Sequence, residues 1–250
     1  YILVNGAECE PYITSDYRRM MDEPQKVVDG LRIVLTLFQH AKGCICIEDN
    51  KPDCIRKMKE LVQDIPRIEV KEMMTKYPQG GERTLIYAVT GREINSSMLP
   101  ADVGCVVDNV ETMVAISNAV LLGRPVMSRI ITITGDGISH PAHYEVLTGT
   151  NVEELVQAAG GLKDNVKKVI SGGPMMGFAM FDLHVPCTKT SSALLCMAED
   201  PASESEATAC INCGRCVKVC PGHVMPSRLA TLAEHGDLEG FQKMDGMECC

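Results

Sequence analysis

The sequence predicts an α/β chain in which a doubly wound parallel sheet is followed by a small β-grasp-like module and a cysteine-rich segment. Strands and helices alternate through the first half of the chain, which is the pattern of a parallel sheet. A strand–strand–helix–strand order then occupies roughly 60 residues. Six of the 13 cysteines fall in the last 41 residues. We therefore expect three domains, at residues 1–124, 125–185 and 186–250.

Four apolar segments are predicted to form the parallel sheet: YILV, CICIED, RIEVKEM and the start of GCVVDNVETM. The first helix lies in EPQKVVDGLRIVLTLFQHAKG, where apolar residues recur at helical spacing before a Lys–Gly stop. A second helix is expected from Asp53 to Ile65. Ligands of such sheets bind at the carboxyl ends of the strands, which is where the polar loop NGAECEPYITSD begins at Asn5.

The later elements follow from turn and cap signals. YPQGGERTLIYAVTGRE indicates a glycine turn, a short helix and another turn. Asn109 lies at the start of a further helix, and Glu111 suits the positive end of its dipole. In the β-grasp-like module, two strands flank a turn in SRIITITGDGISHPAHYEVL, and a helix capped near Thr150 or Asn151 precedes the strand in KKVISGGPMMG. Beyond Asp182 we expect a loose stretch and the polar linker AEDPASESEA.

Composition excludes several classes of protein. A net charge of −9 and 4% aromatic residues argue against nucleic-acid binding, because no basic stripe would follow the phosphates. No apolar run approaches the ~18 residues of a membrane span. No export signal is visible in the sequence, and both ends of the chain are expected to be cut ends of a longer protein. His140 and His143, in SHPAH, are expected to face solvent rather than bind a metal.

The densest chemistry lies in the run CINCGRCVKVCP. Its spacing, C-x-x-C-x-x-C-x-x-x-C-P, is typical of bacterial ferredoxins and is set by Cys210, Cys213, Cys216 and Cys220. The short spacings let three thiolates converge on one [4Fe–4S] cluster, and the longer last step directs the fourth toward a second cluster. Zinc is the main alternative, but zinc sites favour separated C-x-x-C pairs. Free buried thiols are a poor account of four cysteines in 11 residues.

A second cluster-binding run is expected to begin at Cys249, after the helical stretch PSRLATLAEHGDLEGFQKMDGM. The alternative is that Cys249 and Cys250 are ordinary thiols. Seven other cysteines are scattered among apolar stretches and suit small buried side chains in a reducing cytoplasm. Neither cluster is expected to have all its ligands here. We expect Tyr1–Asp182 to pack by apolar burial whether or not clusters form. The region after Ala198 is expected to depend on metal for its order.

Four motifs, taken in order, resemble the RnfC family: NGAECEPYITSDYR, GGERTLIYAVTGRE, LPADVGCVVDNVETM and the cysteine run. Proteins of this family belong to the Rnf complex, a membrane-bound ferredoxin:NAD oxidoreductase that couples electron transfer to ion translocation. They are similar in turn to the NADH-oxidising flavoprotein subunit of respiratory complex I. The resemblance implies a complex I flavoprotein-like FMN-binding domain, an SLBB (soluble-ligand-binding β-grasp) domain and a helical ferredoxin-like segment for two [4Fe–4S] clusters.

The same resemblance implies which residues contact FMN or NAD(H). Those that match the loops N-A-D-E-S-E-P, G-E-E and N-N-V-E-T of the complex I relatives are Asn5, Glu8, Glu10, Glu82, Asn109 and Thr112. The helix that opens at Val110–Glu111 would present backbone amides to the FMN phosphate. Without the family context, Asn5 and Asn109 would be turn and cap residues.

The chain departs from the complex I pattern at three places. Ala7 stands where those relatives have Asp, and Arg83 stands where they have a second Glu. The change at Arg83 is expected to alter contact with the nicotinamide or selectivity for it. The glycine-rich flavin loop of the family, G-G-A-G-F-P, would lie upstream of Tyr1. Complete FMN binding is expected to need that loop.

The sequence therefore predicts an electron-transfer subunit that passes electrons between NAD(H), FMN and two [4Fe–4S] clusters. Flavin is required because NADH gives two electrons as hydride whereas clusters accept one at a time. The implied partners are NADH, the membrane and soluble subunits of the Rnf complex and, indirectly, ferredoxin, at the cytoplasmic side of the membrane. The alternatives are a soluble cobalamin-reductase-like flavin and iron–sulfur protein, or a non-catalytic iron–sulfur docking scaffold.

Overall fold

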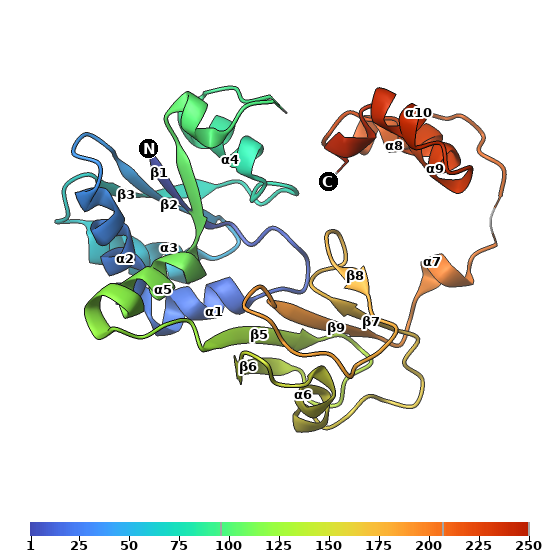
Figure 1. Ribbon diagram of the computed structural model, residues 1–250, viewed down its shortest axis with the longest axis horizontal. Coiled ribbons are helices and arrows are strands. Elements are labelled where there is room, and N and C mark those ends of the chain that lie inside the picture. Colours follow the sequence, from blue (N-terminus) through green and yellow to red (C-terminus); the bar gives the residue numbers. More distant parts are fainter. Residues whose placement is uncertain (96, 207, 250) are drawn as a thin grey trace. The chain divides into compact units, whose positions relative to one another are not determined.

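The computed structural model describes residues 1–95, 97–206 and 208–249. The chain divides into two compact units, Tyr1–Asp200 and Pro201–Cys250. The first unit holds two separate β-sheets, each with its own helices (Figure 1). The second unit is helical and contains the cysteine run.

The first sheet is fully parallel, as predicted. Its strands are β1 (Ile2–Gly6), β2 (Gly43–Glu48), β3 (Ile68–Met73) and β4 (Val106–Asn109). The spatial order is β3-β2-β1-β4, so the chain reverses its direction of travel across the sheet between β1 and β4. Every residue of β2 is buried, which accounts for its unbroken apolar run.

Helices cover both faces of this sheet (Figure 1). One face, which carries Ile2 and Val4, packs against α1 (Ser15–Asp22), α2 (Pro24–Thr36), α3 (Pro52–Val62) and α5 (Val110–Leu122). The other face, which carries Leu3, packs against α4 (Glu82–Thr90) and the 3₁₀ turn η1 (Pro100–Val103). The alternation of β1 side chains thus builds two apolar cores, and the doubly wound prediction is confirmed.

Helices α2 and α5 cross in close contact at a glycine. A β-carbon on Gly30 would lie 2.0 Å from the carbonyl oxygen of Met113. Only glycine lets the two backbones approach this closely, and the approach fixes the position of α5 on the sheet.

The prediction of a polar loop up to Asp16 was incomplete, because the segment SDYRRMMD forms helix α1. This helix buries Met20 and Arg19 against the first core. The side chain of its N-cap residue, Thr14, makes no capping hydrogen bond. The cap comes instead from Glu8, which lies in the preceding loop and gives no local sequence signal.

The second sheet has the predicted β-grasp arrangement. Its strands are β5 (Ser128–Thr134), β6 (Ala142–Leu147), β7 (Lys168–Ser171), β8 (Phe178–Ala179) and β9 (Ala193–Met197), in the order β6-β5-β9-β7-β8. Strands β5 and β9 are parallel neighbours at the centre, and the outer pairs are antiparallel. Helix α6 (Val152–Ala158) packs on one face of this sheet and shares its apolar core.

The stretch beyond Asp182 was expected to be loose, but it contains the central strand β9. The second sheet consequently extends past the expected domain end at residue 185. The five residues ALLCM carry neither periodicity nor turn signals that distinguish a strand. Their strand conformation comes from pairing with β5 on one side and β7 on the other.

The second unit consists of short helices. They are α7 (Pro201–Glu204), α8 (Arg215–Val219), α9 (Pro226–Glu234), α10 (Leu238–Lys243) and the 3₁₀ turn η2 (Gly246–Glu248). The stretch between the cysteine run and Cys249 is thus helical, as the sequence predicts. No helix among the described residues is both long enough and apolar enough to cross a membrane.

Candidate functional site

Asn5 and Asn109 lie side by side at the carboxyl ends of β1 and β4, where the strand order reverses. The side-chain amide of Asn5 donates to the carbonyl of Gly80, 2.8 Å away, in the glycine turn before α4. The side-chain amide of Asn109 donates to the carboxylate of Asp16 at 2.7 Å. Two asparagines therefore join the three sequence motifs at the edge where doubly wound sheets bind ligands.

The N-terminus of α5 faces this edge. Asn109 is its N-cap, and its side-chain oxygen accepts the backbone N–H of Glu111 at 2.8 Å. Thr112 is half-buried in the first turn, and its hydroxyl has no hydrogen-bond partner among the described residues. A free hydroxyl beside helix N-terminal amides is a suitable environment for a phosphate group.

Glu8 holds the start of α1. Its carboxylate oxygens accept the backbone N–H groups of Asp16 at 2.7 Å and Tyr17 at 3.2 Å. The residue adopts a left-handed backbone with φ of 49°, which turns the side chain toward the helix. Burial of the carboxyl group, reinforced by the charge of Asp16, raises the pKa of Glu8 to about 8.

Asp16 is a site residue that the sequence did not reveal. Its burial raises the pKa of the carboxyl group to about 6, although the hydrogen bond from Asn109 acts in the opposite direction. Glu8 and Asp16 therefore form a pair of half-buried acids beside the two asparagines. An aspartate at the start of a short helix gives no sequence signal beyond a favourable helix dipole.

Lys51 is the second residue that sequence reasoning missed. It is 8% exposed, and its ammonium group donates to the carbonyl oxygen of Ala7 at 2.8 Å and to the side chain of Asn50 at 3.0 Å. Glu48 provides the counter-charge 3.7 Å away. The hydrogen bond from the buried Lys51 to the carbonyl oxygen of Ala7 fixes the path of the loop after β1.

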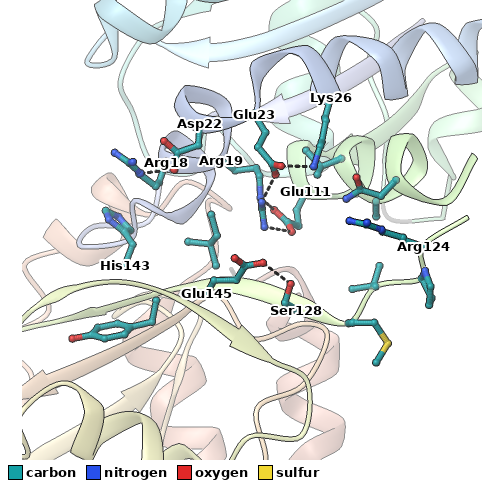
Figure 2. A pocket seen from close by; sticks show the side chains of 18 residues that line it. Arg18, Arg19, Asp22, Glu23, Lys26, Glu111, Arg124, Ser128, His143 and Glu145 are labelled. Carbon is teal, nitrogen blue, oxygen red and sulfur yellow. Dashed lines mark hydrogen bonds and ion pairs between the residues drawn. The ribbon is translucent and has the colours of Figure 1, made fainter. Parts of the chain in front are cut away.

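A buried ion pair supports the site from the side of α5. Arg19 contacts the carboxylate of Glu111 at 2.7 and 3.0 Å, and both residues are 8% exposed. Arg19 also pairs with Glu23, which in turn pairs with Lys26 (Figure 2). Because Glu111 lies two residues after Asn109, this network anchors the start of α5.

The same network lines a cleft of about 670 Å³ between the first sheet's helices and the β-grasp module (Figure 2). Its cationic walls are formed by Arg18, Arg19, Lys26 and Arg124, and its anionic walls by Asp22, Glu23, Glu111 and Glu145. Most of these charges pair within the walls, as Arg18 does with Asp22 at 2.6 Å. The positive and negative charges of the cleft therefore largely balance, so the cleft favours neither an anionic nor a cationic ligand.

Glu10 and Glu82 lie at different places. The carboxylate of Glu10 accepts the backbone N–H groups of Met175 at 3.0 Å and Met176 at 2.6 Å, in the turn between β7 and β8. Glu82 is the exposed first residue of α4. It lies two residues after Gly80. The carbonyl oxygen of Gly80 accepts the side-chain amide of Asn5, and its backbone N–H donates to the sulfur of Cys9 at 3.3 Å.

The cysteine run is at the surface of the second unit. Cys210, Cys213 and Cys216 are exposed, Cys220 is half-buried, and all are free thiols, as is the exposed Cys249. Gly214 has φ of +70° and opens α8. Among the described residues, no group of three or more His, Cys, Asp or Glu side chains has a metal-binding arrangement.

The chain around Cys220 nevertheless runs beside the chain around Cys249. A β-carbon on Gly222 would come within 2.9 Å of the carbonyl oxygen of Glu248. Cys250 lies outside the described residues. Of the seven scattered cysteines, all but the half-buried Cys9 are buried, as expected for small core side chains.

Two family models match successive parts of the chain. The model for the Nuo51 FMN-binding domain matches residues 1–118, and that for the SLBB domain matches residues 130–179. The first match contains the three site motifs and the whole parallel sheet. The second begins within β5 and extends to the end of β8 in the β-grasp sheet.

The curated relatives agree with this order of domains. The C subunit of the proton-translocating ferredoxin:NAD(+) oxidoreductase complex of Clostridium ljungdahlii is 45% identical over 232 residues, which is 93% of this chain and 50% of the relative. Its counterpart in the Na(+)-translocating complex of Acetobacterium woodii is 40% identical over 99% of this chain and 56% of the relative. The chain is a homologue of the C subunits of ion-translocating oxidoreductase complexes. This C-subunit homologue spans about half the length of these two relatives.

Solved structures show the same fold at lower identity. A structure of the NAD⁺-reducing [NiFe]-hydrogenase in its H₂-reduced state matches this chain with a TM-score of 0.64, at 18% identity. That match covers 78% of this chain and 40% of the hydrogenase chain. The air-oxidised state gives a TM-score of 0.65 at 20% identity. The resemblance predicted from the four motifs is thus confirmed, as is the order of an FMN-binding-type domain and a β-grasp domain.

Proposed function

We propose that this chain passes electrons between NAD(H), FMN and [4Fe–4S] clusters as part of a membrane-associated ion-translocating oxidoreductase. Ferredoxin is the other redox partner of the complex. The observation that carries the proposal is the meeting of Asn5, Asn109 and the Gly80 turn at the carboxyl edge of the first sheet, within the part that matches an FMN-binding domain.

The residues present fit a flavin nucleotide at this edge. The hydroxyl of Thr112 and the N-terminal amides of α5 suit its phosphate. The exposed Glu82 offers a carboxylate to its hydroxyls or ring edge. Asn5 and Asn109, whose amides already bond Gly80 and Asp16, hold the edge in shape for the cofactor. Glu8 and Glu10, whose carboxylates already accept backbone N–H groups, shape the loop that faces the cofactor. When bound, FMN supplies the conversion between hydride transfer and one-electron transfer.

The cysteine run fits iron–sulfur clusters by the chemistry and spacing of its thiols. Cys210, Cys213 and Cys216 would hold the first [4Fe–4S] cluster, and Cys220 would serve the second together with Cys249. The close approach of Gly222 to Glu248 supports this pairing, because it keeps the two segments together. Thiolate ligands order such segments when metal binds.

The names of the relatives support a proposal for the partners and location of the whole protein. Both are subunits of complexes whose names include ion translocation and ferredoxin:NAD(+) oxidoreductase activity. We infer that the chain assembles with the membrane and soluble subunits of such a complex, at the cytoplasmic side of the membrane. NADH binds to the chain directly, whereas ferredoxin exchanges electrons with the complex.

Flavin content tests the site. Thr112→Val keeps the shape of the side chain and removes the free hydroxyl, so we expect weaker FMN retention and slower NADH-dependent dye reduction. Thr36→Val, at the exposed end of α2, is the matched control. FMN is measured by fluorescence after denaturation of purified protein that includes the upstream flavin loop. Equal FMN content in both variants and the wild type would refute the placement of the phosphate.

A further inference from the structure

We propose that Glu10 is a positioning residue that fastens the β-grasp module to the site loop. The site loop is defined as residues 7–14, which follow β1. The turn that it contacts is defined as residues 172–177, between β7 and β8. The β-grasp module then acts as a structural part of the candidate site rather than as a spacer behind it. This inference concerns the apoprotein and does not depend on the proposed electron transfer.

The tether is a pair of hydrogen bonds across 165 and 166 residues of sequence. One carboxylate oxygen of Glu10 accepts the backbone N–H of Met175 at 3.0 Å, and the other accepts that of Met176 at 2.6 Å. Bonds from backbone amides to an ionised carboxylate are stronger than neutral ones. They also satisfy two donors in a turn that has no regular secondary structure.

The turn is shaped to receive this carboxylate. A β-carbon on Gly173 would lie 2.1 Å from the Oε2 atom of Glu10 and 2.6 Å from its carboxyl carbon. The φ of Gly173 is outside the left-handed region, so its backbone accepts an L-residue. A methyl group at this position would therefore displace the flexible carboxylate of Glu10 rather than strain the backbone of the turn.

A second contact holds the far end of the site loop. The backbone N–H of Thr14 donates to the hydroxyl of Thr132 on β5 at 3.2 Å. The hydroxyl of Thr14 forms a hydrogen bond with the Nε2 atom of His143 on β6 at 2.8 Å. Glu8, which caps α1, lies between Asn5 and these contacts. With Glu10 and Thr14 both bound to the β-grasp sheet, the module sets the position of the loop relative to the strand edge.

Hydrogen exchange on the purified protein tests the tether. Glu10→Ala should raise the exchange rate of the Met175 and Met176 amides by about 10- to 100-fold, the effect of losing a charge-assisted bond. Peptides from β2 and β9 should keep their protection. Glu60→Ala, which removes an exposed carboxylate from α3, is the matched control and should leave the turn unchanged. Glu10→Gln, with one acceptor oxygen, should fall between the wild type and Glu10→Ala.

A double-mutant comparison makes the test specific. Gly173→Ala should accelerate exchange of the same two amides in the wild type, because its methyl group displaces the carboxylate. In the Glu10→Ala background, Gly173→Ala should have little further effect, since the clashing side chain is gone. Unchanged exchange in Glu10→Ala, or an equal effect of Gly173→Ala in both backgrounds, would overturn the proposal. Neither readout requires FMN, NADH or iron, so loss of electron transfer cannot mimic the result.

Discussion

Replacing Asn109 by alanine should destabilise the first unit by more than the loss of a helix cap. Asn109 caps α5 through Glu111 and also donates to the half-buried carboxylate of Asp16 at 2.7 Å. The cap contributes about 1 kcal/mol. A buried acceptor that loses its donor costs about 1–3 kcal/mol more. The expected decrease in the free energy of unfolding is therefore about 2–4 kcal/mol.

The chain offers a matched control in Asn151. This residue is the N-cap of α6, and its side chain accepts the backbone N–H of Glu153 at 2.9 Å without a buried acid beside it. Asn151→Ala should cost about 1 kcal/mol, the value of a cap alone. The difference between the two variants measures the bond between Asn109 and Asp16.

Urea denaturation at about pH 7.5, followed by circular dichroism, gives both values. The transition midpoint of Asn109→Ala should fall well below that of Asn151→Ala, and the slopes should agree if the unfolded states are alike. If the two variants lose equal stability, the hydrogen bond to Asp16 contributes nothing and our account of the acid pair is wrong.

Three further predictions follow from the buried charges and the thiols. Arg19→Met should lower the free energy of unfolding, measured by urea denaturation, by about 3–5 kcal/mol, because Glu111 keeps an unpaired buried charge. Adding Glu111→Leu should recover most of this loss. A double variant as unstable as the single one would contradict this. The pKa of Glu8 is raised from 4.5 to about 8, so the folded state binds its proton more tightly and this contribution to stability is lost as the pH rises through 8. Glu8→Gln should therefore flatten the decline in unfolding free energy between about pH 6 and pH 8, and an unchanged slope in the same titration would count against it. Anaerobically purified protein with both cluster runs complete should hold about eight irons per chain, and Cys213→Ser should remove about four of them by iron assay; full iron content in that variant would exclude Cys213 as a ligand.

The fold of the first domain was largely predictable because its signals are local. The buried run of β2, the helical spacing in α2 and the cap at Asn109 each lie within a few neighbouring residues. The β-grasp order was visible for the same reason. Elements such as α1 and β9 were missed because their stability comes from distant partners, the Glu8 cap and the neighbours β5 and β7.

The sequence by itself determined the class of the molecule: the parallel sheet, the β-grasp module, the ferredoxin-type spacing and the loops that carry Asn5 and Asn109. It also placed these loops at the carboxyl edge of the sheet, since topology fixes where strands end. Tertiary structure alone decided which loop residues face one another. Asp16, Lys51 and the contact of Glu10 with a turn some 165 residues away depend on burial and on chain segments remote in sequence. No local pattern reports such contacts, because a side chain's partners are set only when the elements pack.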